Sequence, residues 1–339
     1  MNEAELISNY KSSYIGAILD FSTHVVFTGT AFYALWFFKN SPLSVLTIPV
    51  AALTHIKTFI IFHDCGHHSY TPSKFMNHAV GCIAGIFAFT PYTWSSNHAL
   101  HHATVGTLVN KYDIFSETVL HTTRQYNNFS PLGRFFYKAF RHPLIFHTIA
   151  PVFQFLLVQR IQFFLLHRLA ITNRVHLFFA FMEQIVNNVG IVFLYWFANQ
   201  HGVFYHFLLS TFIAPGIGMA LFHSQHVYNP PYMVSIEKYT QKDSGLKGSS
   251  FIHVPWALTY FTGGIEYHHI HHMNSKIPGY NLKKYHADVM NSSDMFKDIV
   301  HLSLYDCYKN LSLTLFDEDK NEYVSFTKAD ASIRNTKDE

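Results

Sequence analysis

The chain has 339 residues, of which 49% are hydrophobic and 13% are charged, whereas a soluble domain usually carries about 25% charged residues. The formal net charge is +3, and the absence of a basic stripe or a reader motif excludes nucleic acid as a partner. Three cysteines without a CxxC pair exclude a disulfide framework and a cysteine-rich zinc or redox site.

Four segments are long and apolar enough to cross a bilayer of about 30 Å. They cover residues 15–38, 43–62, 178–198 and 203–222. Because only a few residues join the members of each pair, the sequence predicts two helical hairpins. The polar residues 1–14 do not resemble a cleavable leader, so we expect a cytosolic N-terminal tail.

Two further apolar stretches, 79–94 and 143–158, are short for a membrane span. If the second stretch crossed the membrane, the last histidine cluster of the chain would face the opposite side from the first two. Ligands of one metal site cannot be divided in this way, so we expect both stretches to be interfacial or re-entrant helices.

The basic residues indicate the orientation. Of 24 Lys and Arg residues, Lys39 lies in a far-side loop and Lys57 inside a span, and the others lie on the side of the termini. The positive-inside rule makes that side cytosolic. The charged chain after about Leu315 is expected outside the core, which divides the protein into a tail (1–14), a membrane domain (15–316) and a polar tail (317–339).

Histidine is the unusual residue, with 25 copies, of which 12 lie in four clusters beside the predicted spans. Within a cluster the spacings are i, i+3 and i+4, which place side chains on one face of a helix. Neutral imidazoles so arranged bind transition metals such as Fe, Cu or Zn. Nine positions fit this pattern: His63, His67, His98, His101, His102, His226, His268, His271 and His272.

A lone histidine is more often a hydrogen-bonded core residue than a ligand, but two HxxHH motifs and one HxxxH in one chain are not explained in this way. His68 and His269, the additional histidines of their clusters, fall off the ligand face. We therefore expect the nine histidines to hold one or two metal ions on the cytosolic side.

The pattern HxxxH, HxxHH and HxxHH on four spans resembles the membrane fatty acid desaturase and hydroxylase superfamily. The segments HDCGHHSY, HALHHATVGTL, FHSQHVY and IEYHHIHHMNSKIPGYNL are similar to acyl-lipid desaturases of the Δ12/omega-6 kind. The resemblance implies an all-α integral membrane fold with a cytosolic helical cap. It also implies two iron ions held by the nine histidines, dioxygen as co-substrate, and a fatty acyl chain, carried on a lipid or a thioester, as substrate.

One position departs from the family. Related acyl-CoA desaturases have an Asn one turn before the ligand of the fourth span, where this chain has Phe222. His223 and Gln225 are therefore candidates for an additional ligand. Asp64, Asp113 and Glu266 are candidates for hydrogen bonds that orient ligand imidazoles, with a solvated or capping carboxylate as the alternative.

The chain has no haem motif and no cysteine cluster for iron–sulfur, so an external electron donor, ferredoxin or cytochrome b5, is implied. Two alternatives remain open. The same metal core serves lipid or carotenoid hydroxylases and ketolases. A histidine-rich metal transporter is the remote alternative, although transporter sites tend to lie near the bilayer midplane in repeated folds.

Overall fold

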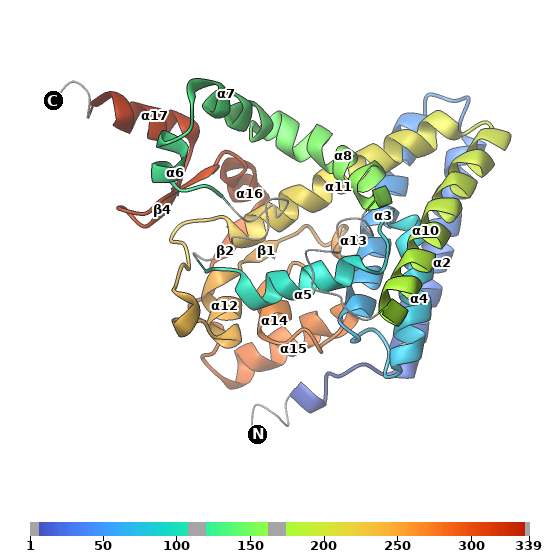
Figure 1. Ribbon diagram of the computed structural model, residues 1–339. Helices are drawn as coiled ribbons and strands as arrows, with labels where there is room; N and C mark the ends of the chain where they lie inside the picture. The colour runs from blue at the N-terminus through green and yellow to red at the C-terminus, as the bar shows by residue number, and fades with distance from the viewer. Residues whose placement is uncertain (1–6, 108–119, 162–173, 336–339) are drawn as a thin grey trace.

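The computed structural model describes residues 7–107, 120–161 and 174–335 of the chain. Over these ranges the protein is mostly helical. Figure 1 shows the long helices mainly at one side of the molecule, with most of the shorter helices and the small strands at the other. The expected all-α membrane architecture is confirmed, and this arrangement separates a membrane-spanning part from a cap.

Four long helices form the spanning part of the described chain. They are α2 (Tyr14–Phe37), α3 (Ser44–Gly66), α10 (Arg174–Gln200) and α11 (Phe204–His226). Each contains a segment long and apolar enough to cross a membrane, as the sequence predicted. α3 and α11 continue beyond the predicted spans, so His63 and His226 lie within the last turns of these helices.

Helix packing joins the two hairpins. α2 packs on α3, α10 packs on α11, and α3 also packs along α11. A buried ion pair lies between α2 and α3, where Lys57 Nζ is 2.8 Å from Asp20 Oδ1. The Tyr70 hydroxyl donates to the same carboxylate at 3.0 Å. Because an unpaired charge is costly within a membrane, this contact compensates Lys57 inside its span.

Short elements lie between the hairpins. In chain order they are α4 (Lys74–Phe87), α5 (Trp94–Thr104), α6 (Thr123–Asn127), α7 (Pro131–Phe140), η1 (Ile145–Ile149), α8 (Ala150–Leu156) and η2 (Val158–Ile161). With 14 residues, α4 rises only about 21 Å, less than a bilayer core. The next apolar stretch is bent by 54° against α7. By length and composition this bent pair could count as one broken span, so its interfacial placement stays a prediction.

The cap follows α11. Its elements are η4 (Ile236–Lys238), α12 (Gln241–Gly248), β1 (Phe251–His253), α13 (Thr259–Thr262), α14 (His268–Met273), α15 (Gly279–Ser292), β2 (His301–Ser303), α16 (Leu304–Asn310), β3 (Leu315–Asp317), β4 (Glu322–Val324) and α17 (Phe326–Asn335). β1 pairs with β2 in parallel, and β3 pairs with β4 in antiparallel. The sequence did not predict these two small sheets.

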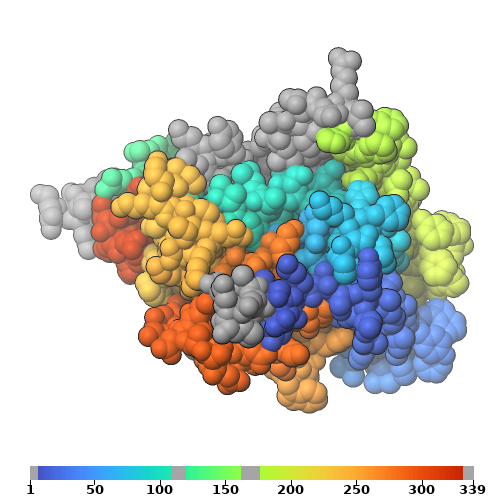
Figure 2. Space-filling view, turned by 90° about the horizontal axis from the view of Figure 1, so that it is seen from below, coloured from blue at the N-terminus to red at the C-terminus, as the bar shows by residue number. Residues whose placement is uncertain are grey.

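The N-terminal segment packs against the cap. Tyr10 is buried and its ring meets that of Tyr285 on α15 edge-on, with centroids 5.4 Å apart. The Asn281 side chain donates to the Tyr10 carbonyl at 2.9 Å. In Figure 2 the blue N-terminal residues lie against the orange region that contains α15. The end of the predicted 1–14 tail is therefore part of the packed structure.

The chain after Leu315 also belongs to the core, which corrects the prediction that it lies outside. Leu315, Val324, Phe326 and Ala329 are buried in one cluster with Tyr126 of α6. The apolar residues stand in adjacent pairs on β3 and β4, and both faces of this hairpin are buried: Leu315 and Val324 pack with Tyr126, whereas Phe316 and Tyr323 pack with Val227. The charged residues within 317–322 lie mainly in the turn between the two strands. The prediction counted the charges of the turn and missed the apolar pair on each side of it.

Candidate metal centre

The first histidine cluster lies where α3 ends. His63 is in the last turn and His67 caps the C-terminus, so their ring centroids are 4.8 Å apart. His68 follows with a φ of +53° and is exposed. The change of backbone conformation turns His68 away, in agreement with the spacing that placed it off the ligand face.

The nine predicted histidines lie together in two groups, in each of which one nitrogen per residue lies within 4.8 Å of all the others. The five-histidine group consists of His63, His67, His98, His102 and His271. The four-histidine group consists of His101, His226, His268 and His272. Both α5 and α14 contribute to both groups. On each helix two histidines four residues apart share one group, and the third histidine joins the other group, because its side chain leaves the helix in a different direction.

The distances in the five-histidine group suit a single ion. His98 Nε2 lies 2.8 Å from His63 Nε2 and 3.1 Å from His102 Nε2. His271 Nε2 lies 2.9 Å from His102 Nε2. Two imidazole nitrogens at about 2.0–2.1 Å from one metal ion and at right angles to each other are about 3 Å apart. The nitrogens therefore already have the separations of neighbouring ligands.

The four-histidine group is similar. His226 Nε2 lies 3.2 Å from His101 Nε2 and 2.8 Å from His268 Nε2. The two groups adjoin each other, because the ring of His102 stacks on that of His272 with centroids 4.1 Å apart and an angle of 15°. Ions held in the two groups would therefore be close neighbours.

Several buried nitrogens need a partner that the described protein does not supply. His67 Nε2 and both ring nitrogens of His272 are buried without a hydrogen bond among the described residues. Burial lowers the pKa of His67, His98 and His102 well below the usual value, and the surrounding imidazoles lower it further. The same causes lower the pKa of His101, His268, His271 and His272. The rings are thus neutral, the form that binds metal, and the donor set fits a pair of transition-metal ions.

Two hydrogen bonds orient the ligand rings. His63 Nδ1 lies 3.2 Å from Asp64 Oδ1, and the other oxygen of Asp64 accepts the Gly279 N–H at 2.7 Å. His226 Nδ1 donates to the Gly248 carbonyl at 3.0 Å. In both rings Nδ1 then carries the proton, which leaves the Nε2 lone pair directed at the group. Asp64 therefore contacts a ligand ring, as the sequence suggested. The partner of His226 could not be identified from the sequence, because it is the backbone carbonyl of Gly248.

His223 and Gln225 lie outside the two groups. His223 Nε2 donates to the Asn310 carbonyl at 3.0 Å, so this side chain binds α16. The Gln225 amide donates to the Ile265 carbonyl at 2.8 Å. Gln225 therefore connects α11 to the segment before α14, and neither residue occupies the position of a further ligand.

Of the two remaining carboxylate candidates, only Glu266 lies in the described part of the chain, and it does not orient a ligand ring. Glu266 accepts a hydrogen bond from Thr262 Oγ1 at 2.6 Å, and among the described residues it forms none with an imidazole of either group. Asp113 lies outside the described residues. His269 is buried, and its Nε2 lies 3.2 Å from His286 Nδ1, so it packs between α14 and α15 as a structural residue.

Two aromatic side chains cover the groups. Trp94 stacks on His98 with centroids 4.5 Å apart and an angle of 14°. The ring of Phe222 lies 5.0 Å from that of His101 and 5.4 Å from that of His226. Each precedes a histidine of the groups by four residues, so the same helical spacing that revealed the ligands could have identified both.

Four membrane-length helices, two of which end at a pair of histidine groups, define the class of membrane metalloenzymes with histidine ligands. The sequence also matches the family described as fatty acid desaturase, over residues 40–301. Because this match covers most of the chain, the protein belongs to the fatty acid desaturase family, as its histidine clusters predicted. It is an enzyme that introduces a double bond into a fatty acyl chain.

Curated relatives agree with this assignment. The chain is 31% identical over 312 residues to a fatty acid desaturase of Bacillus subtilis, with 87% of this chain and 82% of the relative aligned. It is 26% identical to a chloroplastic omega-6 fatty acid desaturase of Spinacia oleracea, covering 80% of this chain and 59% of the relative. It is also 26% identical to an sn-1 oleoyl-lipid 12-desaturase of Picosynechococcus, covering 72% and 69%.

Proposed function

We propose that this protein is a di-iron desaturase of the Δ12/omega-6 type that acts on a fatty acyl chain of a membrane lipid. The carrying observation is the pair of adjoining imidazole groups, which together use all nine histidines selected from the sequence. The names of the plant and cyanobacterial relatives support the position of the double bond and the acyl-lipid carrier.

The bound iron pair would supply the activation of dioxygen and the oxidising power needed to break unactivated C–H bonds. In the overall reaction two adjacent methylenes each lose one hydrogen. Dioxygen is reduced to two water molecules with two electrons and two protons from outside. The protein's contribution is to hold neutral imidazoles in place and to keep the groups buried, with Trp94 and Phe222 covering them.

An external donor, ferredoxin or cytochrome b5, is part of the proposal. We place its docking site, the histidine groups and both termini on the cytosolic side, because the basic residues concentrate there. This placement predicts that the acceptor sequences at Asn128, Asn291 and Asn310 stay unglycosylated in a eukaryotic host. Modification of any of the three would contradict the orientation.

Expression in a desaturase-deficient yeast that is grown on a monounsaturated fatty acid tests the activity directly. We expect a new diunsaturated fatty acid in the membrane lipids, with the second double bond at the Δ12 position, and none with His268→Ala. Hydroxylated products without new double bonds would replace the proposal by a hydroxylase with the same metal core. Transport of metal ions without oxygen consumption would replace it by the transporter, which family membership disfavours.

A further inference from the structure

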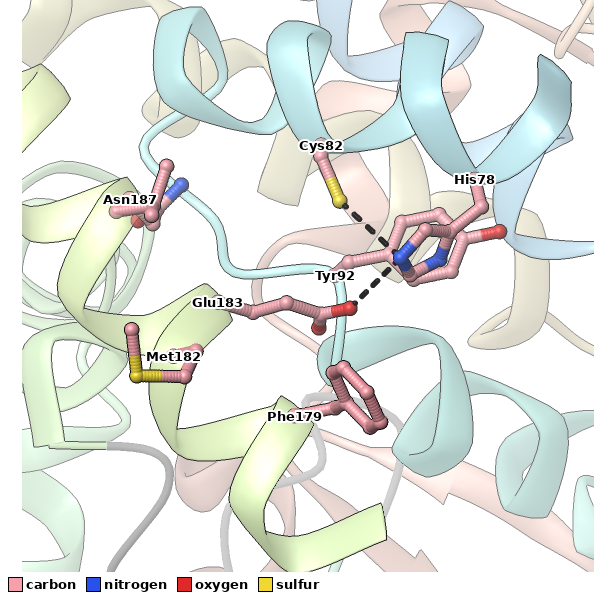
Figure 3. A pocket seen from close by; sticks show the side chains of 8 residues that line it. His78, Cys82, Tyr92, Phe179, Met182, Glu183 and Asn187 are labelled. Atoms are coloured by element: carbon pink, nitrogen blue, oxygen red, sulfur yellow. Dashed lines mark hydrogen bonds and ion pairs between the residues drawn. The ribbon is translucent and has the colours of Figure 1, made fainter. Parts of the chain in front are cut away.

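A third cluster of metal-binding side chains lies away from the two histidine groups. His78 and Cys82 are one turn apart on α4, and Glu183 reaches them from α10, as Figure 3 shows. One ligand atom from each of the three lies within 4.8 Å of the other two. Neither the family assignment nor the proposed desaturation uses these residues.

The distances fit a zinc ion. Glu183 Oε1 lies 3.0 Å from His78 Nε2, and Cys82 Sγ lies 3.7 Å from the same nitrogen. Bonds of about 2.3 Å to sulfur and about 2.0–2.1 Å to nitrogen and oxygen, at angles between a right angle and the tetrahedral angle, place N and O about 3.0–3.4 Å apart. They place S and N about 3.1–3.6 Å apart, so both contacts need little adjustment.

Charge provides an independent reason. Glu183 belongs to a helix that could span the membrane, where an uncompensated carboxylate is costly. Burial, together with the nearby Glu183 carboxylate, raises the pKa of Cys82 to about 12. A divalent cation would remove this repulsion, because its charge balances one thiolate and one carboxylate, while the imidazole is neutral. The complete site would have no net charge.

We propose that His78, Cys82 and Glu183 form a Zn²⁺ site that joins α4 to α10. Binding forms metal bonds to nitrogen, sulfur and oxygen and releases the thiol proton to the solvent, and no electron is transferred. Zinc suits this mixed donor set because it is borderline soft and accepts sulfur, nitrogen and oxygen ligands in a tetrahedral arrangement.

The surroundings leave space for a fourth ligand. The three residues line a cavity of about 220 Å³ whose other walls include Phe179, Met182 and Val186. Half of the His78 side chain is exposed, which gives an ion a path to the site. A water molecule in the cavity would complete four-coordinate zinc, as in zinc sites with three protein ligands.

The site is also supported from behind. The Tyr92 ring meets the His78 ring edge-on at 4.7 Å, and its hydroxyl donates to the Cys65 carbonyl of α3 at 2.8 Å. A Cβ atom at Gly81 would lie 2.3 Å from the Tyr92 ring, so only glycine allows this approach. Tyr92 therefore holds the His78 imidazole and also contacts α3. It lies two residues before the start of α5, which contains three of the metal-site histidines.

Cobalt substitution tests the proposal on the full-length protein in detergent. A thiolate bound to Co²⁺ gives a charge-transfer absorption in the near ultraviolet, and neither histidine group contains a cysteine. We expect this absorption in the wild type and in the control Cys307→Ser, which removes a cysteine outside the cluster. Cys82→Ser should abolish it and lower the bound Co²⁺ by about one ion per chain, and Glu183→Gln should weaken the affinity at least tenfold.

A second measurement uses only the wild-type protein, so it does not require any variant to fold. In the wild-type protein Zn²⁺ should slow alkylation of Cys82 at least tenfold, followed by mass spectrometry, and leave Cys307 unchanged. Absence of the thiolate absorption, its survival in Cys82→Ser, or alkylation of Cys82 that ignores Zn²⁺ would each overturn the proposal. His78 and Glu183 would then form only an ion pair between two helices. None of these outcomes bears on the proposed desaturation, which is measured by products.

Discussion

The five-histidine and four-histidine groups adjoin each other but differ in ligand number and in cover. Five nitrogens occupy most positions around an octahedral ion, whereas four leave one more position for a small molecule. Trp94 stacks on a ring of the larger group, and Phe222 covers the smaller group near His101 and His226. The larger group can therefore lose one imidazole and still hold its ion with four, whereas the smaller group would be left with three.

The largest expected effect is the loss of a ligand from the four-histidine group. His268→Ala leaves three imidazoles, and we expect the bound iron to fall from two ions to one per chain. Activity should fall more than about a hundredfold, since groups that merely orient ligands are already worth about 10–100-fold. Iron analysis of the purified protein and product analysis in yeast measure these effects.

His269→Ala is the matched control, because His269 is the neighbouring residue on α14 but binds His286 instead of a group nitrogen. It should keep both ions. An equal loss of iron in the two variants would show that folding of α14, and not the number of ligands, determines metal content.

A smaller effect is expected for His67→Ala. This substitution leaves four imidazoles in the larger group, the number that the smaller group has by itself. We expect both ions to remain bound at saturating iron, with activity about tenfold lower because the coordination changes. Titration of iron into the apoprotein checks this expectation. If His67→Ala lost an ion as readily as His268→Ala, the two groups would be equivalent and the comparison would fail.

The orienting contact of the larger group can be tested separately. Asp64→Asn keeps an oxygen near His63 Nδ1 but removes the negative charge that favours this tautomer. We expect about 10–100-fold lower activity or iron affinity. Glu266→Gln is the control, since its carboxylate contacts Thr262. A larger loss in Glu266→Gln would show that Glu266, and not Asp64, orients a ligand ring.

The smallest effect is expected at His223. His223→Gln keeps a side-chain donor near the Asn310 carbonyl, so the free energy of unfolding should fall by no more than about 1 kcal/mol. Iron content should not change. Thermal unfolding measures the loss of stability in this variant, and iron analysis of the same protein measures the bound metal. Loss of iron would restore His223 as a candidate ligand.

Sequence alone predicted the four spans and the nine histidines, because both depend on local patterns: the length of an apolar run and the spacing of histidines on a helix. A run of apolar residues has the length of a bilayer wherever it lies, and i, i+3 and i+4 spacings share a helix face in any fold. The exclusion of His68 and His269 followed from the same spacing. The short parallel pairing of β1 with β2 did not, since its strands are about fifty residues apart in the chain.

Only the tertiary structure decided how the nine imidazoles divide. His101 and His102 are adjacent, yet they belong to different groups, because the direction of α5 relative to α11 and α14 determines which ring each can meet. The Gly248 carbonyl that accepts the hydrogen bond of His226 Nδ1 also depends on packing between segments that are 22 residues apart. The partner of Glu266, in contrast, is local, because Thr262 lies only four residues before it. Local spacing therefore determines which side chains can bind metal, and the crossing of helices determines which of them bind together.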